Sequence, residues 1–175
     1  MHMSEFEDAY DEDEASEESG NIGGAILDTL ISDLPLRDPI VVEATSTVSD
    51  AIQAMNDHHT GCVLVQRGGK LIGIFTERDV MTKAFYHDDC RTACVEEVMT
   101  ADPETLQLDD GIAFALNKMS VGGYRHIPIV QLDGVPVGVL SVRDIVDFLV
   151  ELFPQEVLNL PPSSDSVVLR SLDGG

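Results

Sequence analysis

The sequence predicts an α/β protein of the α+β type, built from two copies of one β-α-β-β-α unit. The first observation is an internal repeat: Asp38-Pro39 recurs 64 residues later as Asp102-Pro103, and Arg78-Asp79 recurs 65 residues later as Arg143-Asp144. The second is that each copy alternates segments of helical apolar spacing with short runs rich in β-branched residues. Self-similarity at a fixed period indicates one supersecondary unit used twice.

Both copies predict the same order of elements. An extended piece and a helix come first, then two strands joined by a turn that contains glycine, then a second helix. In the first copy these are expected at 40–42, 49–57, 62–65, 67–70 (the turn), 71–75 and from Thr76 onward. In the second copy they are expected at 105–106, 110–121, 127–130, 132–134 (the turn), 135–140 and 142–152.

The segments that flank the repeats differ from them in composition. Residues 1–21 hold nine acidic residues and no Lys or Arg, so we expect a disordered acidic tail that serves either as a solubilising segment or as an interaction tail. Apolar residues at helical spacing predict a short helix at 22–33. The repeats are expected at 34–90 and 91–155, and an irregular tail at 156–175.

Charge and composition exclude several classes of function. The net charge of −22 repels nucleic acid polymers and anionic lipid, so neither is an expected partner. The chain contains no run of about 18 apolar residues, so we expect no membrane span. Three cysteines are too few, and odd in number, for a disulfide framework, which favours a reducing, cytoplasmic location.

A seven-residue pattern closes the second strand of each copy. It consists of Gly, two apolar residues, Thr or Ser, two variable residues and Asp, and it ends in Thr76 and Asp79 or in Ser141 and Asp144. Either pair alone is typical of a capping box at the start of a helix. A hydroxyl and a carboxylate at the end of a strand also suit a ribose diol, because the carboxylate accepts two hydroxyl hydrogen bonds. The same residues can therefore cap and bind.

The doubled β-α-β-β-α unit with this motif resembles the CBS domain, a family named after cystathionine β-synthase, over residues 34–153. The resemblance implies that the two repeats pack about a pseudo-two-fold axis and form two clefts. It also implies a non-catalytic regulatory module that binds AMP, ADP or ATP and requires no cofactor. S-adenosylmethionine is an alternative ligand in this family, and a ligand-independent interaction scaffold is an alternative function.

The resemblance also implies which residues form each cleft. In one cleft the ribose is held by the second copy, the base lies against the first copy, and a cationic pair meets the phosphate; its residues are Ser141, Asp144, Pro39, Ile40, Val41, Val139, Arg125 and His126. The other cleft is expected to use Thr76, Asp79, Glu104 and Thr105. Its counterpart of Arg125-His126 is Thr60-Gly61, which carries no cation. We therefore expect the cleft of Asp144 to bind the phosphate ligand more tightly.

Other constellations give weaker predictions. His87, Cys90 and Cys94 could ligate zinc, but they lack a second ligand pair, so we expect a loop and no metal. The sequence has neither a nucleophile elbow nor a phosphate-binding glycine loop of the kind found in enzymes. His58-His59 is expected at a helix end and Arg143 in solvent. Apolar helix faces predict a homodimer, which would act on a regulated protein that the sequence does not identify.

Overall fold

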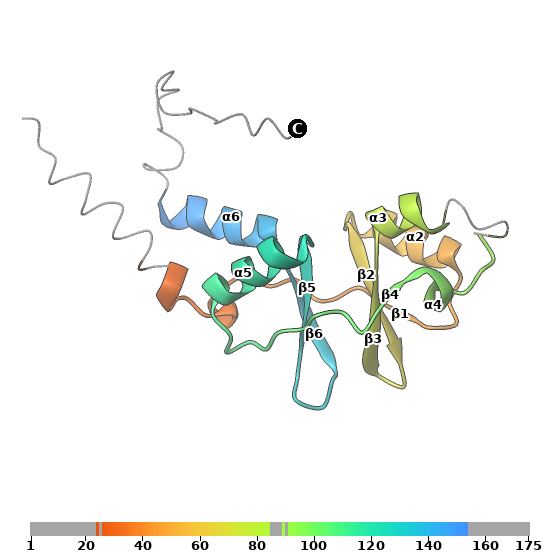
Figure 1. Cartoon of the computed structure of the whole chain (residues 1–175), viewed down its shortest axis with the longest axis horizontal. Coiled ribbons are helices and arrows are strands. Elements are labelled where there is room, and N and C mark those ends of the chain that lie inside the picture. The colour runs from red at the N-terminus through yellow and green to blue at the C-terminus, as the bar shows by residue number, and fades with distance from the viewer. Residues whose placement is uncertain (1–23, 25, 85–88, 90, 154–175) are drawn as a thin grey trace, which may run out of the picture.

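The computed structural model describes residues 24, 26–84, 89 and 91–153. The predicted acidic tail, the predicted C-terminal tail and the residues His87 and Cys90 lie outside the described residues. The described chain forms two lobes that lie side by side (Figure 1). The helices that cover the strands gather at one end of both lobes, and the hairpin turns lie at the other (Figure 1).

The first lobe contains a four-stranded sheet in the order β1-β2-β3-β4. β1 pairs in parallel with β2, and the remaining pairs are antiparallel. Gly68 and Gly69 adopt positive φ in the turn between β2 and β3, a conformation that favours glycine. The elements of this lobe are β1 (Val41–Glu43), α2 (Val48–Asp57), β2 (Cys62–Arg67), β3 (Lys70–Thr76), α3 (Glu77–Thr82), α4 (Val95–Val98) and β4 (Thr100–Ala101).

The second lobe repeats this unit around an antiparallel pair of strands. Its elements are α5 (Ile112–Gly122), β5 (His126–Val130), β6 (Pro136–Ser141) and α6 (Val142–Leu152). Leu106 forms a parallel bridge with Ile129, in the place that β1 occupies in the first lobe. The β-α-β-β-α order predicted for both copies is confirmed, and α6 has the predicted bounds.

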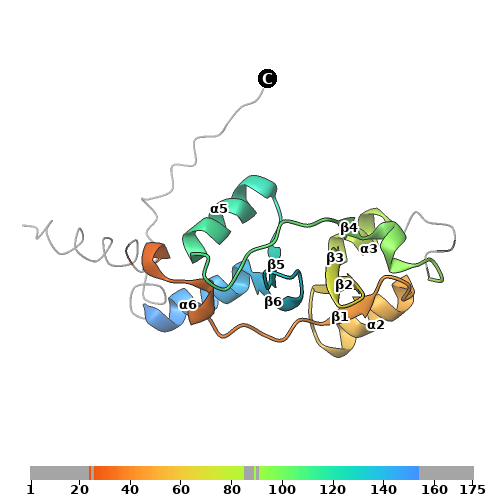
Figure 2. The ribbon, with the colours of Figure 1, turned by 90° about the horizontal axis from the view of Figure 1, so that it is seen from below.

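The core of each lobe includes a segment that lies just before the other lobe in the sequence. The 3-10 helix η1 (Ile31–Asp33) comes before the first lobe, yet Ile31 and Leu34 lie in the core of the second. Conversely, α4 and β4 come before the second lobe but pack on the first. The two connections therefore cross between the lobes in opposite directions (Figure 2).

The N-terminal crossing segment differs from the helix predicted across 22–33. Residues 26–28 are helical and η1 follows, but Leu30 between them is extended and forms a bridge with Gly111. The backbone N–H of Ile31 donates to the carbonyl of Asp110 at 2.9 Å. These bonds to the second lobe interrupt the helix, a tertiary effect that apolar periodicity does not reveal. The elements α4 and β4 were not predicted either.

A third apolar cluster joins the two lobes. Cys62, Leu64 and Ile74 of the first lobe are buried here, and Val139 of the second lobe packs against them. The N–H of Leu71 also donates to the carbonyl of Gly134 across the lobes at 3.0 Å. Burial of apolar surface at this junction fixes how the strand ends of the two lobes face one another.

Shortening Leu64 tests the energetic weight of this junction. Leu64→Ala should lower the free energy of unfolding by about 2–5 kcal/mol, because it leaves a cavity at a fully buried position. The matched Leu132→Ala, at a turn residue that is 91% exposed, should change it by less than about 0.5 kcal/mol. Urea unfolding followed by circular dichroism measures both. Equal effects of the two substitutions would contradict the packing described.

Candidate functional site

The repeated motif forms the same capping geometry in both lobes. At the start of α3, the hydroxyl of Thr76 donates to Oδ2 of Asp79 at 2.7 Å, and the N–H of Thr76 donates to the same oxygen at 3.0 Å. At the start of α6, Ser141 makes the equivalent bonds to Oδ2 of Asp144 at 2.7 and 2.8 Å. One carboxylate oxygen thus fixes each helix start, and the other oxygen, Oδ1, takes no part in the capping box.

A cavity of about 800 Å³ opens between the lobes at the start of α6. Its volume lies within the range of small-molecule sites. Both lobes and the N-terminal crossing segment contribute side chains, so a molecule bound here would touch parts of the chain that are distant in sequence. The residues that matter for its chemistry are Arg37, Asp38, Ile40, His58, His59, Glu77, Arg125, His126, Val139, Ser141, Arg143 and Asp144.

This larger cavity combines cationic groups with a hydrogen-bonding motif. Three guanidinium groups line it, from Arg37, Arg125 and Arg143, together with the imidazoles of His58, His59 and His126. The carboxylates in the lining belong to Asp38, Glu77 and Asp144. Guanidinium groups bind phosphate oxygens in a bidentate manner, so an anionic ligand can be held here although the chain as a whole is strongly acidic.

His126 lies between this cavity and a second, smaller one, and it lines both. Burial lowers the pKa of His126 below its ordinary value, and the positive charge of Arg125 lowers it further. A Cβ atom at Gly61 would lie 3.5 Å from Cε1 of His126, so a larger residue there would press on the ring. The glycine therefore leaves room for the imidazole between the cavities.

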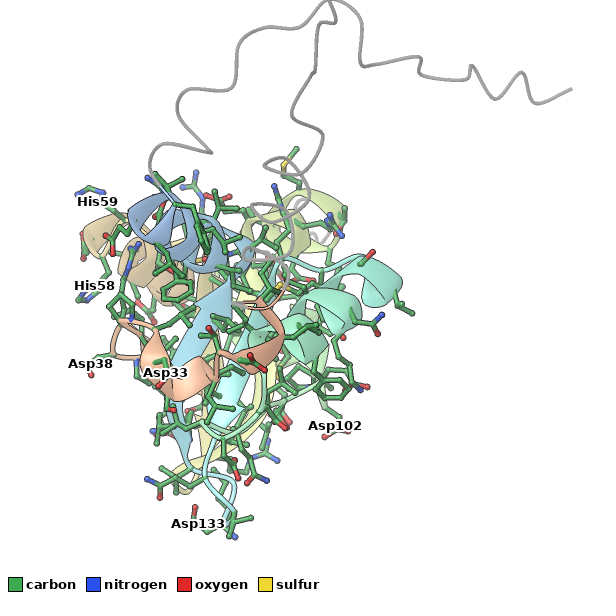
Figure 3. All side chains as sticks on the ribbon, turned by 90° about the vertical axis from the view of Figure 1, so that its left-hand side faces the viewer. Asp33, Asp38, His58, His59, Asp102 and Asp133 are labelled. Atoms are coloured by element: carbon green, nitrogen blue, oxygen red, sulfur yellow. The ribbon has the colours of Figure 1, made fainter. Side chains whose placement is uncertain are left out.

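The smaller cavity, of about 280 Å³, opens at the start of α3. Its lining holds four carboxylates, from Glu77, Asp79, Asp102 and Glu104, and the guanidinium groups of Arg78 and Arg125. Asp38 and both His58 and His59 appear on one side of the molecule, and Asp102 on the opposite side (Figure 3). The larger and the smaller cavity thus open on opposite sides and differ in size and charge.

Most of the residues predicted from the sequence line the cavity expected for them. Ile40, Val139, Ser141, Asp144, Arg125 and His126 line the larger cavity. Thr76, Asp79 and Glu104 line the smaller one. Pro39, Val41 and Thr105 are absent from both linings, and Val41 packs instead against the apolar cluster between the lobes. That any of them binds a ligand stays a prediction.

The structure adds to the expectation about charge. The cleft of Thr76 and Asp79 was expected to lack a cationic counterpart of Arg125-His126, because Thr60-Gly61 stands in that place. The structure places Arg125 and His126 at the wall between the cavities, where they line both. The two clefts thus share this pair, which lies at the start of β5.

Sequence reasoning missed four cationic residues of the larger cavity. Arg37 precedes the repeated Asp-Pro pair, His58 and His59 end α2, and Arg143 begins α6. Arg143 is indeed largely exposed, as predicted, and lies 3.5 Å from Asp147, yet it still lines the cavity. One sequence signal could have pointed to the two histidines: with the offset of 64, His58-His59 of the first copy corresponds to Gly122-Gly123 of the second.

The structure adds two observations on other functions. Within the described residues, no group of three or more His, Cys, Asp or Glu side chains is arranged to hold a metal ion. Cys94 begins α4 as its N-cap residue, while His87 and Cys90 lie outside the described part of the chain. None of the helices described has the length and apolar character needed to cross a membrane.

Comparison with protein families decides the ancestry of this fold. The family model described as "CBS domain" matches residues 31–85 and 95–151. The chain belongs to the CBS domain family. A curated relative, the uncharacterized 17.7 kDa protein in the bps2 3'region of Acidianus ambivalens, is 30% identical over 71% of this chain and 75% of its own length. The chain spans less than a third of the CBS domain-containing proteins of Arabidopsis thaliana that it also matches.

Solved CBS structures share the arrangement of the two lobes. The CBS domain pair of protein MJ0100, in complex with 5'-methylthioadenosine and S-adenosyl-L-methionine, matches with a TM-score of 0.63 and 26% identity over 73% of this chain and 98% of that one. The CBS domain protein PAE2072 from Pyrobaculum aerophilum, complexed with AMP, matches with a TM-score of 0.63 and 23% identity over 72% and 99%. The predicted family and fold class are therefore confirmed.

The pKa of His126 predicts how this CBS pair responds to acid. Its folded-state pKa is lowered, so the unfolded chain takes up the proton at a higher pH than the folded chain does. Stability from this group is fully present above the unfolded pKa and is lost as the pH falls from that value through the lower folded pKa. His126→Asn should therefore lose less stability than the wild type between pH 7.5 and 5.5, as measured by urea unfolding. His58→Asn, at an exposed residue, is the control and should follow the wild type. Identical pH profiles for all three proteins would refute this account of His126.

Proposed function

We propose that this CBS pair is a non-catalytic regulatory module that senses AMP, ADP or ATP in the larger cavity. The observation that supports this most is that one cavity of nucleotide-like size brings together three kinds of group. These are the hydroxyl and carboxylate of the motif, an apolar wall formed by Ile40 and Val139, and a cationic patch at Arg125. A ribose, a base and a phosphate need these three environments.

The ribose would bind at Asp144. Oδ2 of this residue is used by the capping box, whereas the nearest cation to Oδ1 is the guanidinium of Arg37 at 3.8 Å. That guanidinium belongs to a side chain that is 71% exposed, so it can move toward a phosphate when a ligand enters. Two ribose hydroxyls can then donate to Asp144, and Ser141 Oγ can accept a further hydrogen bond.

The phosphate would be held by the cationic patch of the larger cavity. Arg125 offers a planar pair of donors, and Arg37, Arg143 and the histidines at 58 and 59 add positive charge or donors around it. His126 is neutral above its lowered pKa and gains a favourable partner when it becomes protonated beside a phosphate. Phosphate binding and proton uptake by His126 therefore favour one another.

The regulatory signal would be a change in how the lobes are held together. A ligand in this cavity touches Ile40 of the first lobe and Asp144 of the second, so it stabilises arrangements in which both contacts exist. The regulated protein would read this arrangement. The MJ0100 and PAE2072 structures support an adenosine-containing ligand, because every ligand in them carries adenosine.

S-adenosylmethionine is the alternative ligand that those structures suggest. Its sulfonium centre carries a positive charge, and the larger cavity presents the guanidinium groups of Arg37, Arg125 and Arg143. Like charges repel in a partly desolvated site, whereas phosphate is attracted. The charge of the cavity therefore favours nucleotides over S-adenosylmethionine.

A ligand-independent homodimer or interaction scaffold is the second candidate function. Large apolar side chains are exposed on α5 and α6, among them Phe114, Val121, Val146 and Leu152. Exposed apolar groups on neighbouring helices suit a protein interface. Light scattering that finds a dimer, together with nucleotides that neither bind it nor alter it, would favour this candidate over the sensor.

The matched substitutions Asp144→Asn and Asp79→Asn test the proposed sensor. Both remove a capping carboxylate, which should lower stability by about 1 kcal/mol, and Asp79→Asn should lower it further because it also removes the ion pair with Lys83. Asp144→Asn should weaken AMP binding at least tenfold, because hydrogen bonds to a charged acceptor contribute about 1.5–3 kcal/mol. Asp79→Asn should change it less than about threefold. Isothermal titration calorimetry with AMP, ADP and ATP measures the affinities.

Two results would contradict the proposal. Equal losses of affinity in both variants would mean that the two cavities do not differ as proposed. Absence of binding by the wild type for all three nucleotides would exclude a nucleotide sensor. A thermal-shift experiment serves as the independent readout, since a ligand at 100 times its dissociation constant stabilises the folded state by about 2.7 kcal/mol.

A further inference from the structure

The two motif carboxylates differ in what their outer oxygen contacts. Asp79 is 5% exposed, and its Oδ1 accepts from Nζ of Lys83 at 2.7 Å and from the hydroxyl of Thr100 at 3.3 Å. Among the residues that the structure describes, the ion partner of the outer oxygen of Asp144 is Arg37, at 3.8 Å, which is beyond hydrogen-bonding distance. In the first lobe, Lys83 and Thr100 thus already contact the carboxylate oxygen to which a ribose would donate.

Lys83 is held firmly in this position. Besides Asp79, its ammonium donates to the carbonyl of Met99 at 3.2 Å and to the hydroxyl of Thr100 at 3.1 Å. An ammonium has three N–H donors, so these contacts use all of them. Met99 and Thr100 belong to the crossing segment that completes the first lobe, which means that Lys83 ties α3 to β4.

Within the described residues, the second copy has no counterpart of Lys83 and Thr100 at the matching positions, and Asp144 has the longer contact with Arg37 instead. With the offset of 65, Lys83 corresponds to Phe148; with the offset of 64, Thr100 corresponds to Leu36. Both Phe148 and Leu36 pack against the apolar core of the second lobe. An apolar contact there takes the place of the ammonium and hydroxyl, and it leaves the carboxylate of Asp144 to a ligand.

A ribose cannot easily displace Lys83. Sugar hydroxyls and the ammonium of Lys83 both form charge-assisted hydrogen bonds to a carboxylate, but only the ammonium also neutralises its charge. Displacement would also leave the buried carboxylate of Asp79 without its cation, which is strongly unfavourable. The four carboxylates of the smaller cavity oppose a phosphate in addition.

We propose that Lys83 is the residue that makes the two clefts unequal, by occupying the carboxylate of Asp79 and closing the smaller cavity to ribose. The inference rests on the proposed function, because it assumes that a ribose diol binds the motif carboxylate. Lys83 acts as an internal competitor of the ligand. Removing its charge without shortening the side chain should open a second adenosine site in a chain that otherwise has one.

The test uses the full chain and adenosine, which lacks the phosphate that the acidic smaller cavity would repel. Calorimetry should find one adenosine per wild-type chain and two per Lys83→Met chain. In the Asp144→Asn background, where the first site is weakened, Lys83→Met should tighten adenosine binding at least tenfold. The matched control is Lys118→Met in the same background. Lys118 pairs at 2.7 Å with Glu104, another carboxylate of the smaller cavity, and its loss should change nothing.

The outcomes separate this inference from the proposed function. If the wild type binds two adenosines, or if Lys83→Met in the Asp144→Asn background binds no better than the Lys118→Met control, Lys83 does not close the smaller cavity, although the larger one still binds. If no Lys83 variant binds adenosine, the inference is overturned, and if the wild type also binds none of AMP, ADP and ATP, the proposed function is overturned with it. Lys83→Gln is the second variant should the methionine disturb folding, which thermal unfolding without ligand reports.

Discussion

The exchange of segments between the lobes is the constraint on which the rest of this structure depends. Each lobe lacks part of its core until a segment from the other half of the chain fills it, as Ile31 does in the second lobe and Val95 in the first. The apolar cluster around Leu64 then closes the junction. Neither lobe can be complete alone, so the distance between their strand ends is set by packing and not by a flexible linker.

This constraint explains why chemistry appears between the lobes. The crossing segments bring Asp38 to the start of α6 and Asp102 to the start of α3, where the capping boxes lie. Two grooves with the same backbone plan result, and single residues make them different. Phe148 and Leu36 leave Asp144 accessible, whereas Lys83 and Thr100 bind Asp79. The repeat gives two cavities of one plan, and differences between single side chains give them different charges and contacts.

Much of the fold followed from the sequence, because its causes are local. The doubled motif at Thr76 and Ser141 predicted both helix starts, and β-branched runs predicted the strands. Features set by tertiary contacts did not follow. Leu30 is extended because it pairs with Gly111, and α4 forms where a short segment packs into the first lobe.

The candidate site was predictable to the same extent. Ser141 and Asp144 were found because they belong to the repeated motif, and Ile40 because the resemblance to the CBS domain implied it. The positions of Arg37, His59 and Lys83 depend on the direction in which side chains point after folding. A repeat identifies what two copies share. It says little about the residues by which they differ, and those residues determine the charge of each cavity.

The most direct measurement of the central claim is a crystal structure of this CBS pair grown with AMP. The account predicts one nucleotide per chain, between the lobes, with ribose oxygens within hydrogen-bonding distance of Oδ1 of Asp144, the adenine against Ile40 and Val139, and the phosphate near Arg125. A nucleotide seated on Asp79 with Lys83 displaced, or a crystal in which the space between the lobes holds no nucleotide at saturating AMP, would contradict it.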